Sequence, residues 1–278
     1  MPELPEVEHT RRKLERWLRG ARIARVRTDD ARIVRPSSPR AFVRRLEGRK
    51  VDAIDRRGKW LRLVLDDGSR LFLHLGMTGW FEHGSQAAAN PLMSAKGGRE
   101  SPHRFERVRF DVERRGERFG VVYVDPRRWG RMVISDRDID EWNELGPDPL
   151  VDGVDVVALA AKLARRRASS IKEALMDQRI LAGVGNVQAT EALWKAGVDP
   201  RSKAAAVPSS DLRAIARGLR WTIERTLVDL EKGRSARFSV YGRAGETCPR
   251  CGARFERIEL GGRSTTFCPG CQTRRRRL

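Results

Sequence analysis

Four cysteines near the C-terminus carry the most specific chemical signal in this sequence. They are spaced C-x2-C-x16-C-x2-C, and the chain has no other cysteine. Two residues between a pair of thiolates let one turn present both sulfurs to a single ion, and four thiolates form the tetrahedral set that Zn²⁺ prefers. Since every position is cysteine and none is left for water, the pattern predicts one structural zinc ion bound by Cys248, Cys251, Cys268 and Cys271.

A second set of reactive residues lies at the N-terminus, where proline follows the initiator methionine. Removal of Met1 would expose Pro2 as a secondary amine, and terminal amines keep a usable neutral fraction at physiological pH. Such an amine can attack an electrophilic sugar carbon and form an iminium. Glu3 follows at once and Glu6 lies three residues further on, so a carboxylate is available as an acid or base. By composition alone, an ordinary N-terminus is the commoner explanation of a Met-Pro start.

The charge of the chain indicates a polyanionic partner. The 278 residues include 57 Lys and Arg against 37 Asp and Glu, which gives a net charge of +20. A protein with this charge repels itself unless it meets a polyanion, so nucleic acid is favoured over a small neutral substrate or an anionic membrane surface. No apolar run approaches the ~20 residues needed to cross a bilayer, and the acidic N-terminus lacks the apolar stretch of a secretory signal.

The elements that must position these residues change in character near the middle of the chain. An opening helix is predicted over residues 5–19, because Pro5 suits a first helical turn and Gly20 ends the apolar stripe. Alternating apolar residues then predict a hairpin of strands over 61–65 and 71–75, and a second pair over 108–112 and 119–124. Residues 84–104 are rich in Gly, Ser, Ala, Asn and Pro, and we expect them to form a mobile surface loop.

The second half of the chain is predicted to be helical. Residues 146–149, Gly-Pro-Asp-Pro, are expected to be a linker, and the apolar period becomes helical after them. Helices are predicted over 156–163, over 170–179 with a capping box of Ser170 and Glu173, and over 210–232. Another helix is predicted from an N-cap at Asn186 to Gly197. Strands followed by helices indicate separate domains.

Short motifs occur in one order along nearly the whole chain. It begins Met-Pro-Glu-Leu-Pro-Glu-Val-Glu and contains Gly-Lys-Trp at 58–60, His-Leu-Gly-Met-Thr-Gly at 74–79, Asp-Pro-Arg-Arg-Trp-Gly at 125–130, Gly-Val-Gly-Asn at 183–186, Val-Tyr-Gly-Arg at 240–243 and Gly-Gly-Arg-Ser-Thr at 261–265. In these motifs the sequence resembles the formamidopyrimidine-DNA glycosylase family. The resemblance implies an α+β protein. Its parts would be an N-terminal antiparallel β-sandwich with flanking helices (1–140), a helix-two-turn-helix domain (141–240) and a zinc-finger β-hairpin (241–278), with DNA between the domains.

The same resemblance implies a reaction in base-excision repair. Pro2 would attack C1′ of a flipped nucleotide that carries formamidopyrimidine or 8-oxoguanine, and would form a Schiff base. Glu3 would assist the opening of the sugar ring by proton transfer, and β- and δ-elimination would then cleave the abasic strand. The base must leave the stack because its reactive carbon is shielded there. The protein would be a monomeric DNA glycosylase and AP lyase that acts on damaged double-stranded DNA in the bacterial cytoplasm.

Four further matched positions take phosphate-binding roles from the resemblance. Lys59 and Arg263 would act on phosphates at the lesion as part of the catalytic set, and His74 would contact the DNA backbone. Asn186 would bind a flanking phosphate, which suits a helix start where backbone N–H groups favour anions. Without the motifs, Lys59 would more often be a solvated surface residue and His74 a structural one.

Three matched positions would fill the void that the extruded base leaves in the duplex: Met77, Arg127 and Trp129. Arginine can bond the orphaned partner base, and a flat ring can wedge between base steps. The family usually has Phe where this chain has Trp129, and commonly has Tyr where this chain has Gln188. Taken without the motifs, Met77 and Trp129 would more often be core residues.

The sequence does not decide which damaged base is preferred, because one loop is short. Only about residues 233–239 separate the last long helix from Val-Tyr-Gly-Arg, where the family's 8-oxoguanine enzymes carry a longer loop that caps the base. The related endonuclease eight branch, which prefers oxidised pyrimidines, also lacks much of that loop. We therefore keep two alternatives: a glycosylase that prefers oxidised pyrimidines, and a non-catalytic zinc-finger protein that binds damaged DNA. A metal-dependent nuclease would need a carboxylate cluster, and the sequence has no convincing one.

Overall fold

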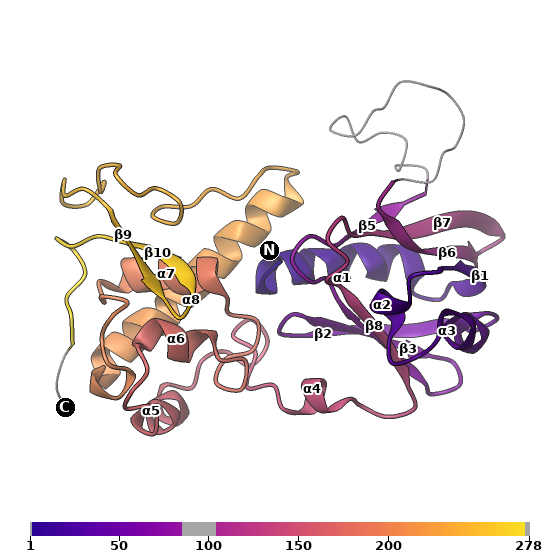
Figure 1. The fold of residues 1–278 in the computed structure, drawn as a ribbon, viewed down its shortest axis with the longest axis horizontal. Helices are drawn as coiled ribbons and strands as arrows, with labels where there is room; N and C mark the ends of the chain where they lie inside the picture. Colours follow the sequence, from indigo (N-terminus) through magenta and orange to yellow (C-terminus); the bar gives the residue numbers. More distant parts are fainter. Residues whose placement is uncertain (1, 85–103, 276–278) are drawn as a thin grey trace. The chain divides into compact units, whose positions relative to one another are not determined.

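The computed structural model describes residues 2–84 and 104–275, and the chain divides into two compact units (Figure 1). Unit 1 contains Pro2 and Val7–Asn143, whereas unit 2 contains Glu3–Glu6 and Glu144–Leu278. The loop expected at 84–104 lies, apart from its two end residues, outside the described residues. Among the described residues, no helix is both long enough and apolar enough to cross a bilayer.

Unit 1 is built on two four-stranded antiparallel sheets, which confirms the expected β-sandwich. One sheet has the order β1-β6-β7-β5 and consists of Arg22–Arg27, Glu106–Arg114, Glu117–Val124 and Trp80–His83. The other has the order β2-β3-β4-β8 and consists of Val51–Arg57, Trp60–Leu65, Arg70–His74 and Arg131–Ser135. Both predicted hairpins are present as β3–β4 and β6–β7. The alternating leucines of β3 and β4 are buried in the core, as their period of two requires.

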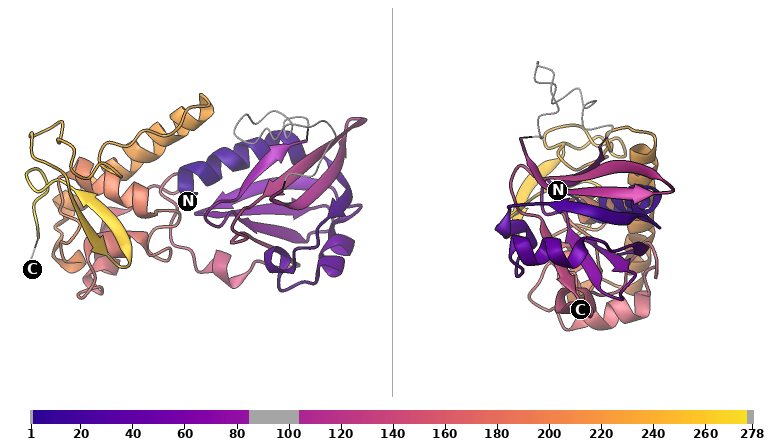
Figure 2. Two further views of the ribbon diagram at one scale, coloured as in Figure 1. Left: turned by 45° about the horizontal axis from the view of Figure 1, so that its top comes forward. Right: turned by 90° about the vertical axis from the view of Figure 1, so that its right-hand side faces the viewer.

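Helices cover the sandwich of unit 1. The longest is α1, Leu4–Leu18, which begins and ends within a residue of the prediction and lies along the strands in the left view of Figure 2. Its apolar stripe of Val7, Leu14 and Leu18 is buried in the same core as the strands. A buried ion pair between Glu8 of α1 and Arg56 of β2, at 2.9 Å, fixes the helix to the sheet. The shorter helices are α2 (Ala31–Val34), α3 (Pro39–Leu46) and α4 (Asp140–Asn143).

Unit 2 is helical and carries the C-terminal hairpin. Its elements are α5 (Val156–Ala164), α6 (Ile171–Met176), α7 (Asn186–Ala196), the 3-10 turn η1 (Ala204–Ala206), α8 (Ser209–Glu231), β9 (Glu256–Leu260) and β10 (Arg263–Phe267). The capping box at the start of α6 is confirmed, with both reciprocal bonds between Ser170 and Glu173. Gly197 ends α7 in the left-handed conformation, as predicted.

The predicted end of α6 and the predicted linker in unit 2 were wrong. Helix α6 ends at Met176 instead of near Arg179, because the Asp177 side chain accepts the N–H of Arg179 and competes with the helix for it. Residues 146–149 are packed and are not a free linker. The Gly146 N–H donates to the Gln178 carbonyl at 2.9 Å, and the Pro147 carbonyl accepts the Ala182 N–H at 3.0 Å. The boundary between the two units falls earlier, after Asn143.

Candidate functional site

The carboxylate of Glu3 is held by the first turn of α7. Its Oε1 accepts the backbone N–H of Val187 at 2.9 Å, and its Oε2 accepts that of Gln188 at 3.0 Å. The residue is only 1% exposed. A helix N-terminus offers unpaired N–H groups and a positive dipole end, so it is a favourable place for a carboxylate. The N–H of Glu3 in turn donates to Glu6 Oε2 at 2.9 Å, and burial raises the pKa of Glu6.

This arrangement overturns the prediction that Asn186 is the N-cap of α7. The N-cap is Gly185, which has extended backbone and no side-chain bond, and the capping oxygens come from Glu3. Asn186 is the first helical residue, and its side chain is used elsewhere. Its Oδ1 accepts from Lys172 Nζ at 2.5 Å, and its Nδ2 donates to the Ser264 carbonyl of β10 at 3.1 Å.

The glycines of the Gly-Val-Gly-Asn motif are required by this close approach. A Cβ on Gly185 would lie 2.2 Å from Glu3 Cδ, which no relaxed structure tolerates. Gly183 has a φ of +87°, and a Cβ there would lie 2.8 Å from Leu4 Cβ. The Gly183 carbonyl also accepts the N–H of Leu4 at 3.1 Å. The motif therefore allows residues 3–4 to lie against the start of α7.

Lys172 is a buried residue that sequence reasoning missed. Its ammonium donates to Asn186 Oδ1 and, at 2.6 Å, to Thr265 Oγ1, so it joins α6 and α7 to β10. Burial lowers the pKa of Lys172 to about 8, and the nearby charge of Arg263 acts in the same direction, whereas Glu3 opposes both. A lysine in the first turn of a helix usually faces water, so the sequence contained no signal for this position.

Arg263 lies at the tip of the C-terminal hairpin. It is the first residue of β10 and is exposed, and it follows Gly261 and Gly262, which both have positive φ. Two such residues between paired strands form the tight turn typical of a two-residue hairpin. Since Lys172 responds to the charges of both Arg263 and Glu3, unit 2 brings three predicted residues, Glu3, Asn186 and Arg263, around one buried ammonium.

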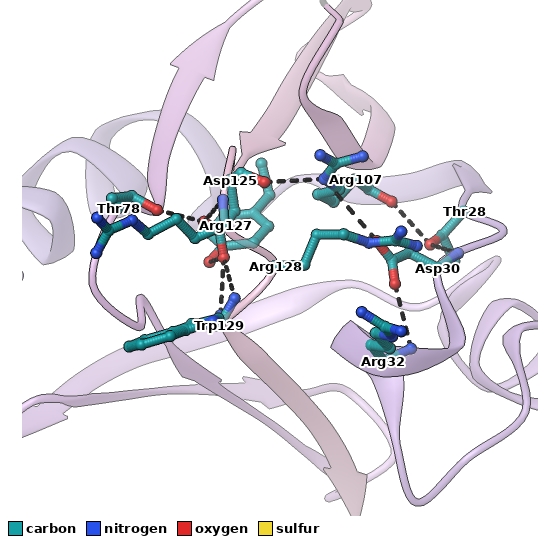
Figure 3. Close-up of polar contacts among 11 residues, drawn as sticks. Thr28, Asp30, Arg32, Thr78, Arg107, Asp125, Arg127, Arg128 and Trp129 are labelled. Carbon is teal, nitrogen blue, oxygen red and sulfur yellow. Dashed lines mark hydrogen bonds and ion pairs between the residues drawn. The ribbon is translucent and has the colours of Figure 1, made fainter.

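In unit 1, the buried carboxylate of Asp125 organises the predicted void-filling segment (Figure 3). It accepts the hydroxyl of Thr78 at 2.7 Å and the backbone N–H groups of Arg127, Trp129 and Gly130 at 3.1, 2.8 and 2.8 Å. One acceptor thus fixes residues 125–130 and also ties them to the 74–79 motif. Asp125 belongs to a quoted motif, but the sequence indicated no role for it.

The three predicted void-filling side chains lie together in unit 1. Arg127 Nη1 is 3.9 Å from Met77 Sδ, and its guanidinium carbon is 5.7 Å from the centre of the Trp129 ring. Trp129 is 60% exposed, which is unusual for an indole and excludes the core role considered for it. The group therefore presents an aromatic face and a guanidinium to solvent on a backbone held by Asp125 (Figure 3).

A second carboxylate, Asp30, holds the middle of the same segment. Arg128 Nε donates to Asp30 Oδ2 at 2.6 Å, and Arg128 has a φ of +57°, in the left-handed region that non-glycine residues rarely adopt. Asp30 is buried and also accepts the N–H of Arg32 (Figure 3). The ion pair therefore compensates a strained backbone at the residue between Arg127 and Trp129. No motif in the sequence marked Asp30.

Lys59 and His74 lie close enough together in unit 1 for their charges to interact. Lys59 occupies the two-residue turn between β2 and β3, after Gly58 with a φ of +57°, as the strand pattern indicated. Burial lowers the pKa of His74 to about 4, and the charges of Lys59 and Arg131 add to this effect. His74 Nδ1 accepts the Gly76 N–H at 3.2 Å. The ring is therefore neutral at pH 7, with its proton on Nε2.

Pro2 is partly exposed and is followed directly by Glu3. The structure thus places the predicted residues in two groups, which belong to different units. Unit 1 holds Pro2, Lys59, His74, Met77, Arg127 and Trp129. Unit 2 holds Glu3, Asn186, Arg263 and the four cysteines.

The four cysteine sulfurs form one cluster, in which all lie within 4.8 Å of one another. Cys248 and Cys271 are 3.6 Å apart, and Cys251 and Cys268 are 3.4 Å apart. Tetrahedral zinc with Zn–S bonds of ~2.3 Å needs sulfurs ~3.8 Å apart, so the cluster fits the ion. The predicted structural zinc site, with its four ligands on two turns, is confirmed.

We predict that Asp125→Asn loosens residues 125–130. The amide replaces one acceptor oxygen with a donor, which then faces backbone N–H groups. Leaving those groups unpaired should cost about 3 kcal/mol. Hydrogen exchange of the Trp129 and Gly130 amides, followed by NMR, measures the effect. Asp111→Asn is the control, because it removes a carboxylate of unit 1 whose ion pair within the described residues is with Arg27 near the surface. Unchanged protection of the two amides in Asp125→Asn would contradict this account.

Three family models together match most of the chain. The Formamidopyrimidine-DNA glycosylase N-terminal domain matches residues 1–132, and the H2TH domain of the same enzymes matches residues 145–238. The zinc finger found in FPG and IleRS matches residues 245–274.

Named relatives and solved structures agree with these models. A formamidopyrimidine-DNA glycosylase of Brucella ovis is 36% identical over 295 residues, covering 98% of this chain and all of the relative. A Lactococcus lactis glycosylase bound to AP-site DNA has a TM-score of 0.82 at 27% identity, covering 98% of this chain and 99% of that one. Its complex with FAPY-dG DNA has the same score and identity, covering 98% and 100%. The chain therefore belongs to the formamidopyrimidine-DNA glycosylase family.

Proposed function

We propose that this DNA glycosylase excises oxidised bases through a Schiff base on Pro2 and then cleaves the abasic strand by β,δ-elimination. The observation that carries the proposal is the position of Glu3, whose carboxylate directly follows Pro2 and is bound at the start of α7. A carboxylate with both oxygens fixed cannot swing away, so the groups that would exchange protons with the sugar are preorganised. We also propose that the enzyme acts as a monomer in the cytoplasm.

In the proposed reaction, the imino nitrogen of Pro2 attacks C1′ of the damaged nucleotide. The bond from C1′ to the base breaks, and the base leaves with the bonding electrons and gains a proton. The attacking nitrogen gives up its N–H proton to Glu3 and so regains its lone pair. Glu3 passes that proton to the ring oxygen as the C1′–O bond breaks and the sugar opens, and the nitrogen lone pair forms the iminium. Loss of a C2′ proton then expels the 3′-phosphate, and a second elimination expels the 5′-phosphate.

The proposed DNA contacts follow from charge and donor geometry. Arg263 is exposed at its hairpin tip, and Lys59 is half-buried in a tight turn, and both would contact phosphates through their positive charge. The neutral ring of His74 would act as a hydrogen-bond donor through Nε2 and would add no positive charge. The Asn186 side chain is engaged, so its phosphate contact would use its backbone N–H, which has no acceptor within the described chain. Arg127 and Trp129 would enter the duplex.

Sodium borohydride trapping tests the Pro2 chemistry. Protein that lacks Met1, mixed with an abasic duplex and borohydride, should form a covalent adduct on denaturing gels. A parallel reaction with sodium chloride at the same ionic strength should form none, which separates reduction from the effect of salt on binding. Pro2→Gly should bind the duplex and lose most base release. No adduct from wild-type protein, or full turnover by Pro2→Gly, would contradict the proposal and leave the non-catalytic DNA binder as the better description.

The substrate is proposed to be an oxidised purine, formamidopyrimidine or 8-oxoguanine. The names of the relatives support the formamidopyrimidine lesion, as does the lesion in the Lactococcus lactis complex. A panel of matched duplexes with formamidopyrimidine, 8-oxoguanine and oxidised pyrimidines should show the fastest excision for the two purine lesions. Faster excision of oxidised pyrimidines would instead favour the alternative that the short segment 233–239 suggests.

Gly185→Ala tests the position of Glu3. The new Cβ would displace the Glu3 carboxylate, and a shift of about 1 Å at a reacting group costs on the order of a hundredfold in rate. We expect excision to fall by that factor while zinc content and affinity for abasic DNA stay within twofold of wild type. Val187→Ala is the control, because it keeps the N–H that Glu3 accepts. Normal excision by Gly185→Ala would show that the contact does not matter for the reaction.

A further inference from the structure

The indole of Trp194 lies beside the zinc ligands and has an unused donor. Trp194 is in the last turn of α7 and is 6% exposed, in one apolar cluster with Val240, Phe255 and the ligands Cys248 and Cys268. Its Nε1–H is fully buried and has no hydrogen-bond partner within the described residues. A buried donor without an acceptor lowers the stability of the folded protein by about 1–3 kcal/mol. An acceptor for this N–H would therefore stabilise the fold.

The sulfur of Cys248 lies in the same apolar cluster and, as a zinc-bound thiolate, can supply that acceptor. The Trp194 ring and the Cys248 sulfur pack in one apolar cluster, and Arg250, two residues after Cys248, holds the ring against the turn that carries this cysteine. Cys248 is itself buried, at 1% exposure. When zinc binds, the ligand becomes a thiolate whose negative charge lies in an apolar cluster, and donors around it then stabilise the site.

Arg250 holds the indole in place. Its guanidinium carbon is 4.2 Å from the centre of the Trp194 ring. Its Nη2 donates to the Trp194 carbonyl at 2.6 Å, and its Nη1 donates to the Lys195 carbonyl at 3.3 Å. Arg250 lies between the first two cysteines, so the turn that carries them is attached to the C-terminal end of α7 on which Trp194 sits. The ring therefore has little freedom to turn its N–H elsewhere.

We propose that the Trp194 indole N–H donates to the zinc-bound Cys248 thiolate and slows the loss of zinc from the protein. Trp194 is a positioning residue for the metal site and does not bind the ion. Loss of partners that hydrogen-bond to metal ligands typically costs 10- to 100-fold in metal affinity. Removal of the N–H alone should therefore speed zinc release by about tenfold.

Trp194→Phe removes the donor and keeps an aromatic ring for Arg250 to cover. The zinc-loaded full chain is mixed with excess chelator, and release is followed with a coloured zinc indicator. Trp221→Phe is the matched control, because Trp221 packs against the same cluster but has its ring against Lys195 and Arg225. We expect release about tenfold faster from Trp194→Phe than from wild type, with Trp221→Phe within twofold of wild type. Equal rates for the two variants would overturn the proposal.

A direct measurement on the unmutated chain covers the case in which Trp194→Phe fails to load zinc. Replacement of zinc by ¹¹³Cd should give a scalar coupling between the metal and one indole proton, transmitted through the N–H···S contact. The signal is assigned to Trp194 by comparison with Trp194→Phe, or by selective labelling if that variant does not fold. A Trp194 indole proton that shows no coupling to ¹¹³Cd would overturn the proposal.

Discussion

Two backbone N–H groups at the start of α7 bind the carboxylate of Glu3, and much of unit 2 is arranged around this contact. Gly185 leaves room for the carboxylate, and Gly183 leaves room for Leu4. On the other side of the same helix start, Asn186 and Lys172 connect α7 to β10, next to Arg263. The start of α7 therefore orders both an acidic and a basic group.

Buried carboxylates that accept several backbone N–H groups recur in this protein. Asp125 orders the segment that carries Arg127 and Trp129. Glu191 of α7 accepts the N–H groups of Ser239, Val240 and Tyr241 at 2.8 Å each, which fixes the Val-Tyr-Gly-Arg segment after α8. In each case an irregular segment is stabilised by charge-assisted hydrogen bonds, because a loop cannot supply the ladder bonds of a sheet or helix. Arg127 and Trp129 are on an irregular segment whose backbone is held by hydrogen bonds to Asp125.

The sequence was a good guide wherever the signal was local. Strand alternation, the Ser170 capping box and the cysteine spacing each depend on residues within a few positions, and the structure confirms them. The N-cap predicted for α7 was wrong. An asparagine after a glycine-rich turn is a good local N-cap, but the oxygens that cap this helix belong to Glu3, 184 positions before Val187 in the chain. Lys172 and Asp30 were missed for the same reason, since their partners are distant in sequence. The catalytic and DNA-binding roles of the site residues, Pro2 and Lys59 among them, remain predictions.

The separation between Glu3 and α7 along the chain also sets an order of events during translation. The ribosome adds about 5–20 residues per second, so the residues that bind the Glu3 carboxylate are polymerised roughly 10 to 40 seconds after Glu3 itself. Throughout that interval the first residues have no site to occupy. Enzymes that trim nascent chains therefore meet an undocked end, and Glu3 is buried at the start of α7 only once most of the polypeptide exists.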